Sequence, residues 1–342
     1  MDRSDASAAA AGRPLLAVSD LVVEFRGKQG NVVANDHLFL DILPGETLGI
    51  VGESGSGKSV LCRAILRLLP SPPAWVRAGS LMFEGRDLMG LDDAEMRRVR
   101  GQDISMIFQN PMSSLNPVWP IGDQVAEPLR QHKGMARKEG RMATIELLRR
   151  VGIPAPEKRI DDYPFQWSGG MMQRAVIAMA LAGAPKLMLA DEPTTALDVT
   201  IQDQILALLL ELQRESAMAL VLVSHDMGVI AETCDRIVVM YAGRIVEHAS
   251  TPQIFETPAH PYTLGLLRSI PRLDARRTRL SSIPGQPPDL TQLGIGCAFA
   301  DRCALATPEC RTARVELRSV GPGHTSACLY PDRVAALARD EA

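Results

Sequence analysis

Residues 52–59, with the sequence Gly-Glu-Ser-Gly-Ser-Gly-Lys-Ser, constrain the fold of this chain more than any other segment. They follow the apolar run of residues 47–51 and open a helix-like run from Lys58 to Leu69. Glycines at this spacing let backbone N–H groups turn inward around phosphate oxygens at the positive end of a helix. The segment therefore predicts an α/β fold with a strand that delivers a phosphate-binding loop.

The side chains at the end of this loop have specific predicted contacts. Lys58 would reach the β- and γ-phosphates, and the Ser59 hydroxyl would bind Mg²⁺. An ordinary Gly-rich turn is the alternative, but it would not require Lys-Ser at this position. The predicted phosphate-loop contacts are Gly52, Ser54, Gly55, Ser56, Gly57, Lys58, Ser59 and Val60.

A second apolar run, residues 187–190, ends in two carboxylates, Asp191 and Glu192. Open α/β sheets bind their ligands at the carboxyl ends of the strands. Asp191 fits a Mg²⁺ ligand, and Glu192 fits the group that polarises the attacking water in phosphoryl transfer. Capping of the following helix is the simpler alternative, and it is disfavoured here because a phosphate loop precedes the pair.

Composition limits the possible partners and the compartment. The formal net charge of −3 comes without a basic stripe, so nucleic acid is not indicated. No apolar run approaches the roughly 20 residues of a membrane span, and residues 1–14 lack the apolar centre of a secretory signal. We expect a disordered leader and a cytoplasmic protein.

The order of strand-like and helix-like runs predicts three parts. Residues 15–270 form one large α/β domain, in which residues 111–183 lose the strand signal and predict a helical insertion. After Ser281 the chain becomes rich in Pro and Gly and bears cysteines, which places a boundary near Pro271 and predicts residues 271–342 as a small C-terminal extension.

Four cysteines crowd into that extension: Cys297, Cys303, Cys310 and Cys328. In a reducing compartment such clustering favours metal ligation over disulfides. Four thiolates suit tetrahedral zinc or a cubane cluster, and the spacing matches neither zinc-ribbon pairs nor a ferredoxin run. The spacing leaves both ligands open.

Ser168, Gly169 and Gly170 begin a helix-like run, where a free hydroxyl and bare backbone offer a second anion site. At this point the chain resembles the ABC ATPase family, whose signature is Leu-Ser-Gly-Gly-Gln, with Trp167 and Met171 in place of Leu and Gln. The resemblance implies a β-rich N-terminal subdomain, a RecA-like parallel core and a helical insertion. It also implies that this signature closes over the γ-phosphate held by a partner subunit.

Further matches follow in the order of the family. Gln109 resembles the loop glutamine that approaches Mg²⁺ and the water, and His225 resembles the switch histidine at the γ-phosphate. Asp198 resembles the loop by which paired subunits sense each other, and Phe25 resembles the aromatic residue that stacks on adenine. The alternatives are a solvated amide, a structural histidine, a helix cap and a core phenylalanine, respectively.

Three stretches resemble the oligopeptide/dipeptide importer branch: residues 110–117 (Asn-Pro-Met-Ser-Ser-Leu-Asn-Pro), 260–263 (His-Pro-Tyr-Thr) and 283–285 (Ile-Pro-Gly). The likeness implies an ATP-hydrolysing subunit at the cytoplasmic membrane face. Its implied partners are a second, different ATPase subunit, two transmembrane permeases and an extracytoplasmic solute-binding protein. The cysteine-rich tail of the branch implies a [4Fe-4S] cluster, with Zn²⁺ as the alternative.

The alternatives differ in the cargo or in the class of protein. The cargo could be nickel, an opine or a sugar instead of peptide. Soluble ABC proteins of DNA repair or translation carry coiled-coil insertions or two cassettes, neither of which occurs here. A regulatory ATP-binding module would not need Lys58, Asp191, Glu192 and His225 together, and a small-molecule kinase would have no use for Ser-Gly-Gly.

Overall fold

The computed structural model describes residues 13–27, 30–195, 197–270 and 283–339. Its centre is a sheet in which five neighbouring strands run parallel, in the order β10 (Arg236–Tyr241), β3 (Thr47–Val51), β9 (Ala219–Ser224), β8 (Leu187–Asp191) and β7 (Ile104–Ile107). Strands β3 and β8 are buried along their whole length, as expected for a parallel sheet covered on both faces. The predicted α/β class and parallel core are confirmed.

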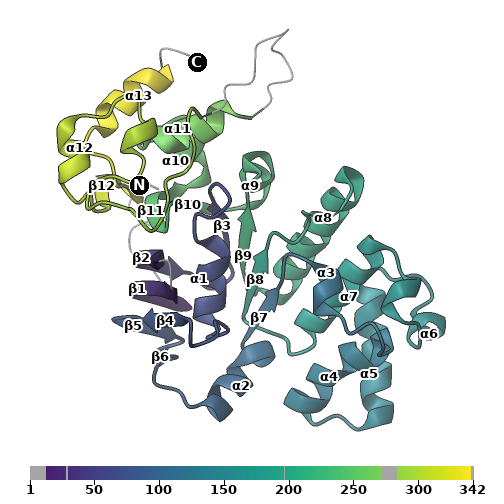
Figure 1. Ribbon diagram of the computed structural model, residues 1–342. Helices are drawn as coiled ribbons and strands as arrows, with labels where there is room; N and C mark the ends of the chain where they lie inside the picture. The colour runs from purple at the N-terminus through teal and green to yellow at the C-terminus, as the bar shows by residue number, and fades with distance from the viewer. Residues whose placement is uncertain (1–12, 28–29, 196, 271–282, 340–342) are drawn as a thin grey trace, which may run out of the picture.

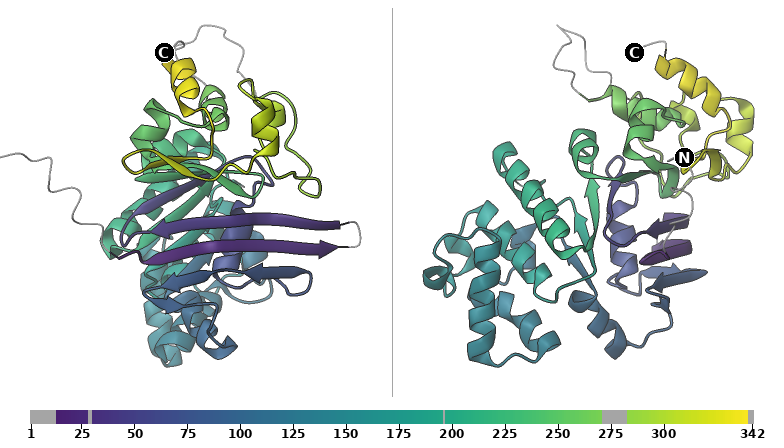
Figure 2. Two further views of the ribbon diagram at one scale, coloured as in Figure 1. Left: turned by 90° about the vertical axis from the view of Figure 1, so that its left-hand side faces the viewer. Right: turned by 180° about the vertical axis from the view of Figure 1, so that it is seen from behind.

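A second, antiparallel sheet forms the N-terminal part. Its longest strands are β1 (Leu16–Gly27) and β2 (Gly30–Ile42), which lie side by side as a long ribbon (Figure 2). The short strands β4 (Ala74–Arg77), β5 (Ser80–Phe83) and β6 (Arg86–Asp87) complete it. Helix α2 (Asp93–Gln102) follows and begins with a capping box.

The segment predicted as helical, residues 111–183, is helical in the structure. Its helices are α3 (Pro111–Ser114), α4 (Ile121–Lys133), α5 (Arg137–Arg150), α6 (Pro156–Arg159) and α7 (Gly169–Leu181), with the 3-10 turn η1 (Pro164–Gln166) before α7. They gather on the side of the molecule away from β1 and β2 (Figure 1). Their apolar faces meet one another and the main sheet through buried residues such as Val125, Leu148 and Val176. Burial of this kind stabilises helices that propensity alone would not.

Two more helices, α8 (Val199–Ser216) and α9 (Met227–Thr233), accompany the parallel strands. The helix after the phosphate loop, α1 (Lys58–Ile65), is shorter than the predicted run to Leu69. Arg67 has φ 50°, a left-handed conformation that ends the helix, and its side chain donates to the carbonyls of Leu88 and Leu91.

The C-terminal part continues the main sheet. Strand β11 (Arg244–Ser250) pairs with β10, β13 (His324–Ser326) pairs with β11, and β12 (Arg318–Gly321) pairs with β13. Several short helices lie around this edge of the sheet (Figure 1). They are α10 (Thr251–Glu256), α11 (Pro261–Arg268), the 3-10 turn η2 (Ala300–Arg302), α12 (Pro308–Thr312) and α13 (Pro331–Arg339). Residues beyond the predicted boundary thus share a sheet with the parallel core.

The predicted leader and the predicted boundary at Pro271 fall mostly or wholly outside the described residues. The leader, residues 1–14, lies outside the described residues except for positions 13 and 14, and so does the boundary at Pro271. In the described part of the chain, no helix combines the length and the apolar character needed to cross a bilayer.

Candidate functional site

The phosphate loop connects β3 to α1, at the carboxyl end of the central strand. Two of its glycines have backbones that another residue would not fit. Gly52 has φ 151° and Gly57 has φ 98°, and a Cβ would lie 2.1 Å from the Met240 carbonyl oxygen at Gly52 and 2.3 Å from the Ala34 carbonyl oxygen at Gly57. The loop therefore packs tightly against β10 and β2 at these two glycines.

Lys58 lies inside this loop and is only 5% exposed. Its ammonium donates to the carbonyl oxygens of Gly52 at 2.7 Å and Glu53 at 3.0 Å, and to Ser56 Oγ at 3.3 Å. Burial lowers the pKa of Lys58, while Glu192 and Asp191 oppose that shift. A buried cation held by the loop's own carbonyls is suited to receive an anion.

Asp191, the last residue of β8, lies across from the start of α1. The Ser59 hydroxyl donates to Asp191 Oδ1 at 2.8 Å, and the carboxylate is 1% exposed. Its Oδ2 atom is buried and has no hydrogen-bond partner among the described residues, and burial raises the pKa of Asp191. A hydroxyl beside an unsatisfied carboxylate oxygen is the oxygen-donor arrangement that Mg²⁺ prefers, so these two residues fit that ion.

Glu192 forms the second half of the site. Its Oε2 atom accepts from Gln109 Nε2 at 3.0 Å and from Thr195 Oγ1 at 2.9 Å, and it lies 3.6 Å from His225 Nδ1. Glu192 has φ 48°, which turns the chain sharply at the end of β8. The structure therefore brings Glu192, Gln109 and His225 together, although they are far apart in the sequence.

Other predicted residues lie elsewhere. Ser168 is the N-cap of α7, where its Oγ accepts from the Met171 amide at 3.4 Å, and Gly169 is exposed beside it. These residues belong to the helical part, away from α1 (Figure 1). Asp198 is the exposed N-cap residue of α8, and its neighbour Ala196 lies outside the described residues. Phe25 is half-buried on β1 and packs on the core of the N-terminal sheet.

The four tail cysteines face one small pocket, which Phe299 and Tyr330 also line. None of them forms a disulfide. In the described ranges, however, no group of three or more His, Cys, Asp or Glu side chains is placed to hold a metal ion. The four thiols thus share one pocket but are not arranged as the ligands of a [4Fe-4S] cluster or of Zn²⁺.

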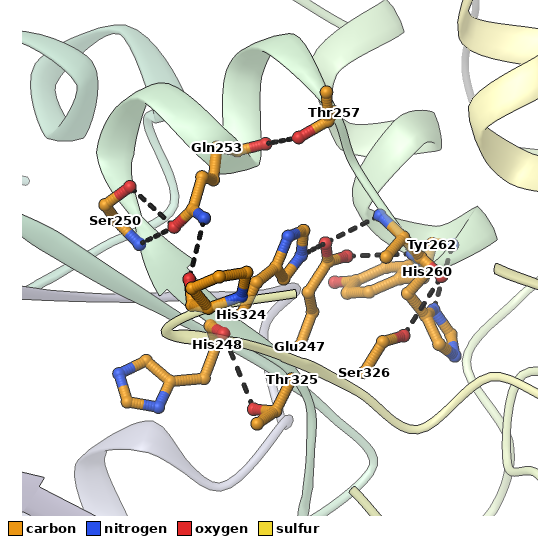
Figure 3. Close-up of polar contacts among 12 residues, drawn as sticks. Glu247, His248, Ser250, Gln253, Thr257, His260, Tyr262, His324, Thr325 and Ser326 are labelled. Atoms are coloured by element: carbon orange, nitrogen blue, oxygen red, sulfur yellow. Dashed lines mark hydrogen bonds and ion pairs between the residues drawn. The ribbon is translucent and has the colours of Figure 1, made fainter. Parts of the chain in front are cut away.

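The sequence did not identify the groups that support the site from the C-terminal part. Glu247 is fully buried on β11 and accepts from the amides of Ala259 and His260 at 2.7 and 2.9 Å, and from His324 Nε2 at 2.7 Å (Figure 3). Tyr262 lies two residues after His260, and its hydroxyl accepts from the Glu53 amide of the phosphate loop at 2.7 Å. The motif at residues 260–263 was the available signal, but its partners are distant in the sequence.

The fold and these side chains define a P-loop ATPase with a helical insertion. A family model described as ABC transporter matches residues 36–195, and one described as oligopeptide/dipeptide transporter, C-terminal region, matches residues 246–310. The chain belongs to the ABC transporter ATP-binding family, in the branch that carries this C-terminal region, and it is an ATPase.

Individual relatives agree with this assignment. The chain is 50% identical to the oligopeptide transport ATP-binding protein OppD of Bacillus subtilis, over 85% of this chain and 82% of that protein. It is also 50% identical to the dipeptide transport ATP-binding protein DppD of Haemophilus influenzae, over 90% and 93%. Among solved structures, the dimeric ABC transporter cassette MJ0796 superposes with a TM-score of 0.61 at 29% identity, covering 69% of this chain and 98% of that one.

Proposed function

We propose that this chain hydrolyses ATP to power the import of dipeptides or oligopeptides across the cytoplasmic membrane. The observation that carries the proposal is the joint occurrence of the Glu192, Gln109 and His225 group with a C-terminal region of the oligopeptide/dipeptide type. The names of the Bacillus and Haemophilus relatives support peptide as the cargo. The chemistry follows from the chain's own residues.

In the proposed reaction, the phosphate loop and Lys58 hold the β- and γ-phosphates, and Ser59 and Asp191 hold Mg²⁺. When bound, Mg²⁺ supplies charge neutralisation at the phosphate oxygens. Glu192 accepts a proton from water as the water oxygen attacks the γ-phosphorus and the bond to the β–γ bridging oxygen breaks. Gln109, already bonded to Glu192, orients that water, and His225 donates to the γ-phosphate through one ring nitrogen.

The proposed site is completed by another subunit. Ser168, Gly169 and Gly170 lie apart from the chain's own phosphate loop, which supports their action on nucleotide held by a second ATPase subunit. Asp198 would sense the opposite site at the same interface. Two permeases and an extracytoplasmic binding protein complete the proposed importer, with this chain as a peripheral subunit on the cytoplasmic face. The dimeric state of the related cassette MJ0796 supports such a pair.

Glu192→Gln tests the assigned base. The amide keeps the size and the polar contacts of Glu192 but cannot accept a proton, so ATP binding should persist while turnover falls about 10²–10⁴-fold. Binding is measured with a fluorescent ATP analogue and turnover by phosphate release. Glu211→Gln, at an exposed position of α8, is the matched control and should leave both unchanged. Normal turnover in Glu192→Gln would refute the assignment.

The cysteine cluster is a separate proposal. We infer that Cys297, Cys303, Cys310 and Cys328 bind a [4Fe-4S] cluster, with Zn²⁺ as the alternative, because all four face one pocket. Iron, sulfide and zinc analysis of anaerobically purified protein tests it. About four iron and four sulfide per chain are expected from a cubane, whereas one zinc would support the alternative. Protein that contains neither would refute metal binding.

A further inference from the structure

Glu53, the second residue of the phosphate loop, points its carboxylate at the C-terminal part of the chain. Arg302, in η2, donates to it through both arms of its guanidinium: Nη1 to Oε2 at 2.6 Å and Nη2 to Oε1 at 3.0 Å. The Arg302 side chain is 6% exposed, and that of Glu53 is 26% exposed. A bidentate, shielded pair of this kind fixes direction as well as distance.

Arg302 is itself held in place. Its Nε atom donates to the Pro284 carbonyl at 2.9 Å, Nη2 donates to the Ile283 carbonyl at 3.3 Å, and Nη1 donates to the Tyr241 hydroxyl at 3.2 Å. The Ile-Pro-Gly motif thus has a physical role, because its carbonyls orient the guanidinium. The hydrogen bonds that Arg302 donates to the Glu53 carboxylate raise the pKa of Arg302 above its ordinary range, so the group stays charged.

A second group from the C-terminal part binds the backbone of the same residue. The Tyr262 hydroxyl accepts from the Glu53 amide at 2.7 Å. Tyr262 is fully buried, and its ring packs on Tyr241, with centroids 4.6 Å apart, and on Phe299, with centroids 5.4 Å apart. His260, the N-cap of α11, places it by accepting from the Tyr262 amide (Figure 3).

These contacts converge on one peptide group. The Glu53 N–H and the Gly52 C=O belong to the same planar unit, so its orientation is a single variable. Tyr262 holds the N–H side, and the Lys58 ammonium donates to the C=O side at 2.7 Å. A rotation of this peptide would move the oxygen that positions Lys58, and the Arg302 contact opposes that rotation through the Glu53 side chain.

We propose that Arg302 and Tyr262 are positioning residues for nucleotide binding, which hold the Gly52–Glu53 peptide and through it the Lys58 ammonium. The C-terminal part of the chain thereby sets the affinity of the phosphate loop for ATP. The inference rests on residues 52–59 being the phosphate loop, as proposed above. It extends that assignment by giving the branch motifs at residues 260–263 and 283–285 a role in ATP binding.

The test uses the full chain, with Arg302→Met to remove the charge, Arg302→Lys to restore it and Tyr262→Phe to remove a single oxygen. MgATP affinity is measured by competition with a fluorescent ATP analogue, and hydrolysis gives kcat and KM. We expect Arg302→Met to weaken MgATP binding and to raise KM about tenfold, with kcat within about twofold of the parent value. Tyr262→Phe should raise KM several-fold. Arg302→Lys should recover part of the affinity that Arg302→Met loses. Arg141→Met, which breaks an exposed bidentate pair with Asp161, is the matched control and should change neither constant.

A double-mutant cycle tests whether Glu53 and Arg302 affect MgATP affinity through their contact with each other. Glu53→Gln combined with Arg302→Met should weaken binding no further than Arg302→Met alone, because both remove one interaction. Unchanged MgATP affinity in both Arg302→Met and Tyr262→Phe would overturn the inference, even if thermal stability falls. Lys58→Ala separates the two assignments. If Lys58→Ala binds ATP as tightly as the parent protein, the phosphate-loop assignment itself is refuted. If Lys58→Ala loses ATP affinity but Arg302→Met and Tyr262→Phe do not, only the inference about Arg302 and Tyr262 is refuted.

Discussion

At the scale of single residues, Gly57 shows how closely the phosphate loop is fitted to the strands around it. A Cβ there would meet the Ala34 carbonyl at 2.3 Å and Asn35 Nδ2 at 2.6 Å, at φ 98°. Gly57→Ala should lower the free energy of unfolding by at least about 2 kcal/mol. Gly134 has φ 63° and open space where a Cβ would lie, so Gly134→Ala should lower the free energy of unfolding by only about 1 kcal/mol. Denaturant unfolding compares them, and equal losses would contradict a packing role.

Asp191 allows a test of the cation site at the same scale. Asp191→Asn removes the charge beside the Ser59 hydroxyl and should weaken Mg²⁺-dependent ATP binding about 10–100-fold, as loss of a ligand's support usually does. Binding measured in EDTA should change little. Titration of Mg²⁺ at fixed ATP provides the measurement. An equal loss with and without Mg²⁺ would show that Asp191 acts on the loop and not on the ion.

The sequence predicted Lys58 and Ser59 from the Gly-rich loop that opens a helix, and Asp191 and Glu192 from their position at the end of an apolar strand. It could not find the Arg302 contact, because Glu53 and Arg302 are 249 residues apart and charge gives no pairing rule at that separation. Nor could it place the Asp191 oxygen that has no partner. Such details depend on packing and not on local pattern.

At the scale of elements, Glu247 joins β11 to β13 and to the start of α11 (Figure 3). Glu247→Ala would leave two amides and a buried histidine without their acceptor, so unfolding free energy should fall by about 3–5 kcal/mol. Glu84→Ala breaks the exposed pair with Lys186 and should cost less than about 1 kcal/mol. Similar costs for the two variants in chemical denaturation would argue against this joint.

His260 gives α11 a predictable response to pH. It is fully buried, and burial lowers its pKa from 6.5 to about 3. The unfolded chain therefore binds a proton that the folded chain does not between these values, so stability is present above pH 6.5 and falls as pH drops. One such group contributes about 1.4 kcal/mol per pH unit. His260→Asn keeps an N-cap acceptor and should flatten the slope of unfolding free energy between pH 6 and 4; an unchanged slope would contradict this account.

The elements differ in how far the sequence predicts them. Strands β3, β8 and β9 are continuous apolar runs, which predict buried parallel strands directly. Strands β12 and β13 are short, and β13 pairs with β11 about 80 residues earlier in the chain, so no local signal marks them. The capping box that starts α2 at Asp92 and Glu95 was visible in the sequence and could have predicted that helix.

At the scale of the whole molecule, the signature segment should act on nucleotide bound by another subunit. Gly169→Asp places a negative charge at the exposed start of α7, where a Cβ has ordinary room beside Leu197. ATP binding to the chain's own loop should remain within about twofold of the parent, while ATPase activity of the assembled complex is lost. Lys58→Ala should instead lose binding. Lost binding in Gly169→Asp would place the signature at the chain's own nucleotide.

The general architecture followed from the order of motifs, with residues 271–342 predicted as an extension separate from the ATPase domain. In the structure, residues of that extension continue the main sheet through β13 and contact the phosphate loop through Arg302. This arrangement depends on a joint between distant segments, which composition does not reveal. For the same reason, we expect substitutions in the C-terminal part that break these contacts to change the affinity for nucleotide.

The importer assignment is tested most directly by purifying the tagged chain in detergent from membranes of its native host and identifying the retained proteins by mass spectrometry. We expect two permeases, a second ATPase subunit and a solute-binding protein, in amounts that scale with the tagged chain. Recovery of soluble partners alone would contradict the transport function and leave the ATPase assignment standing.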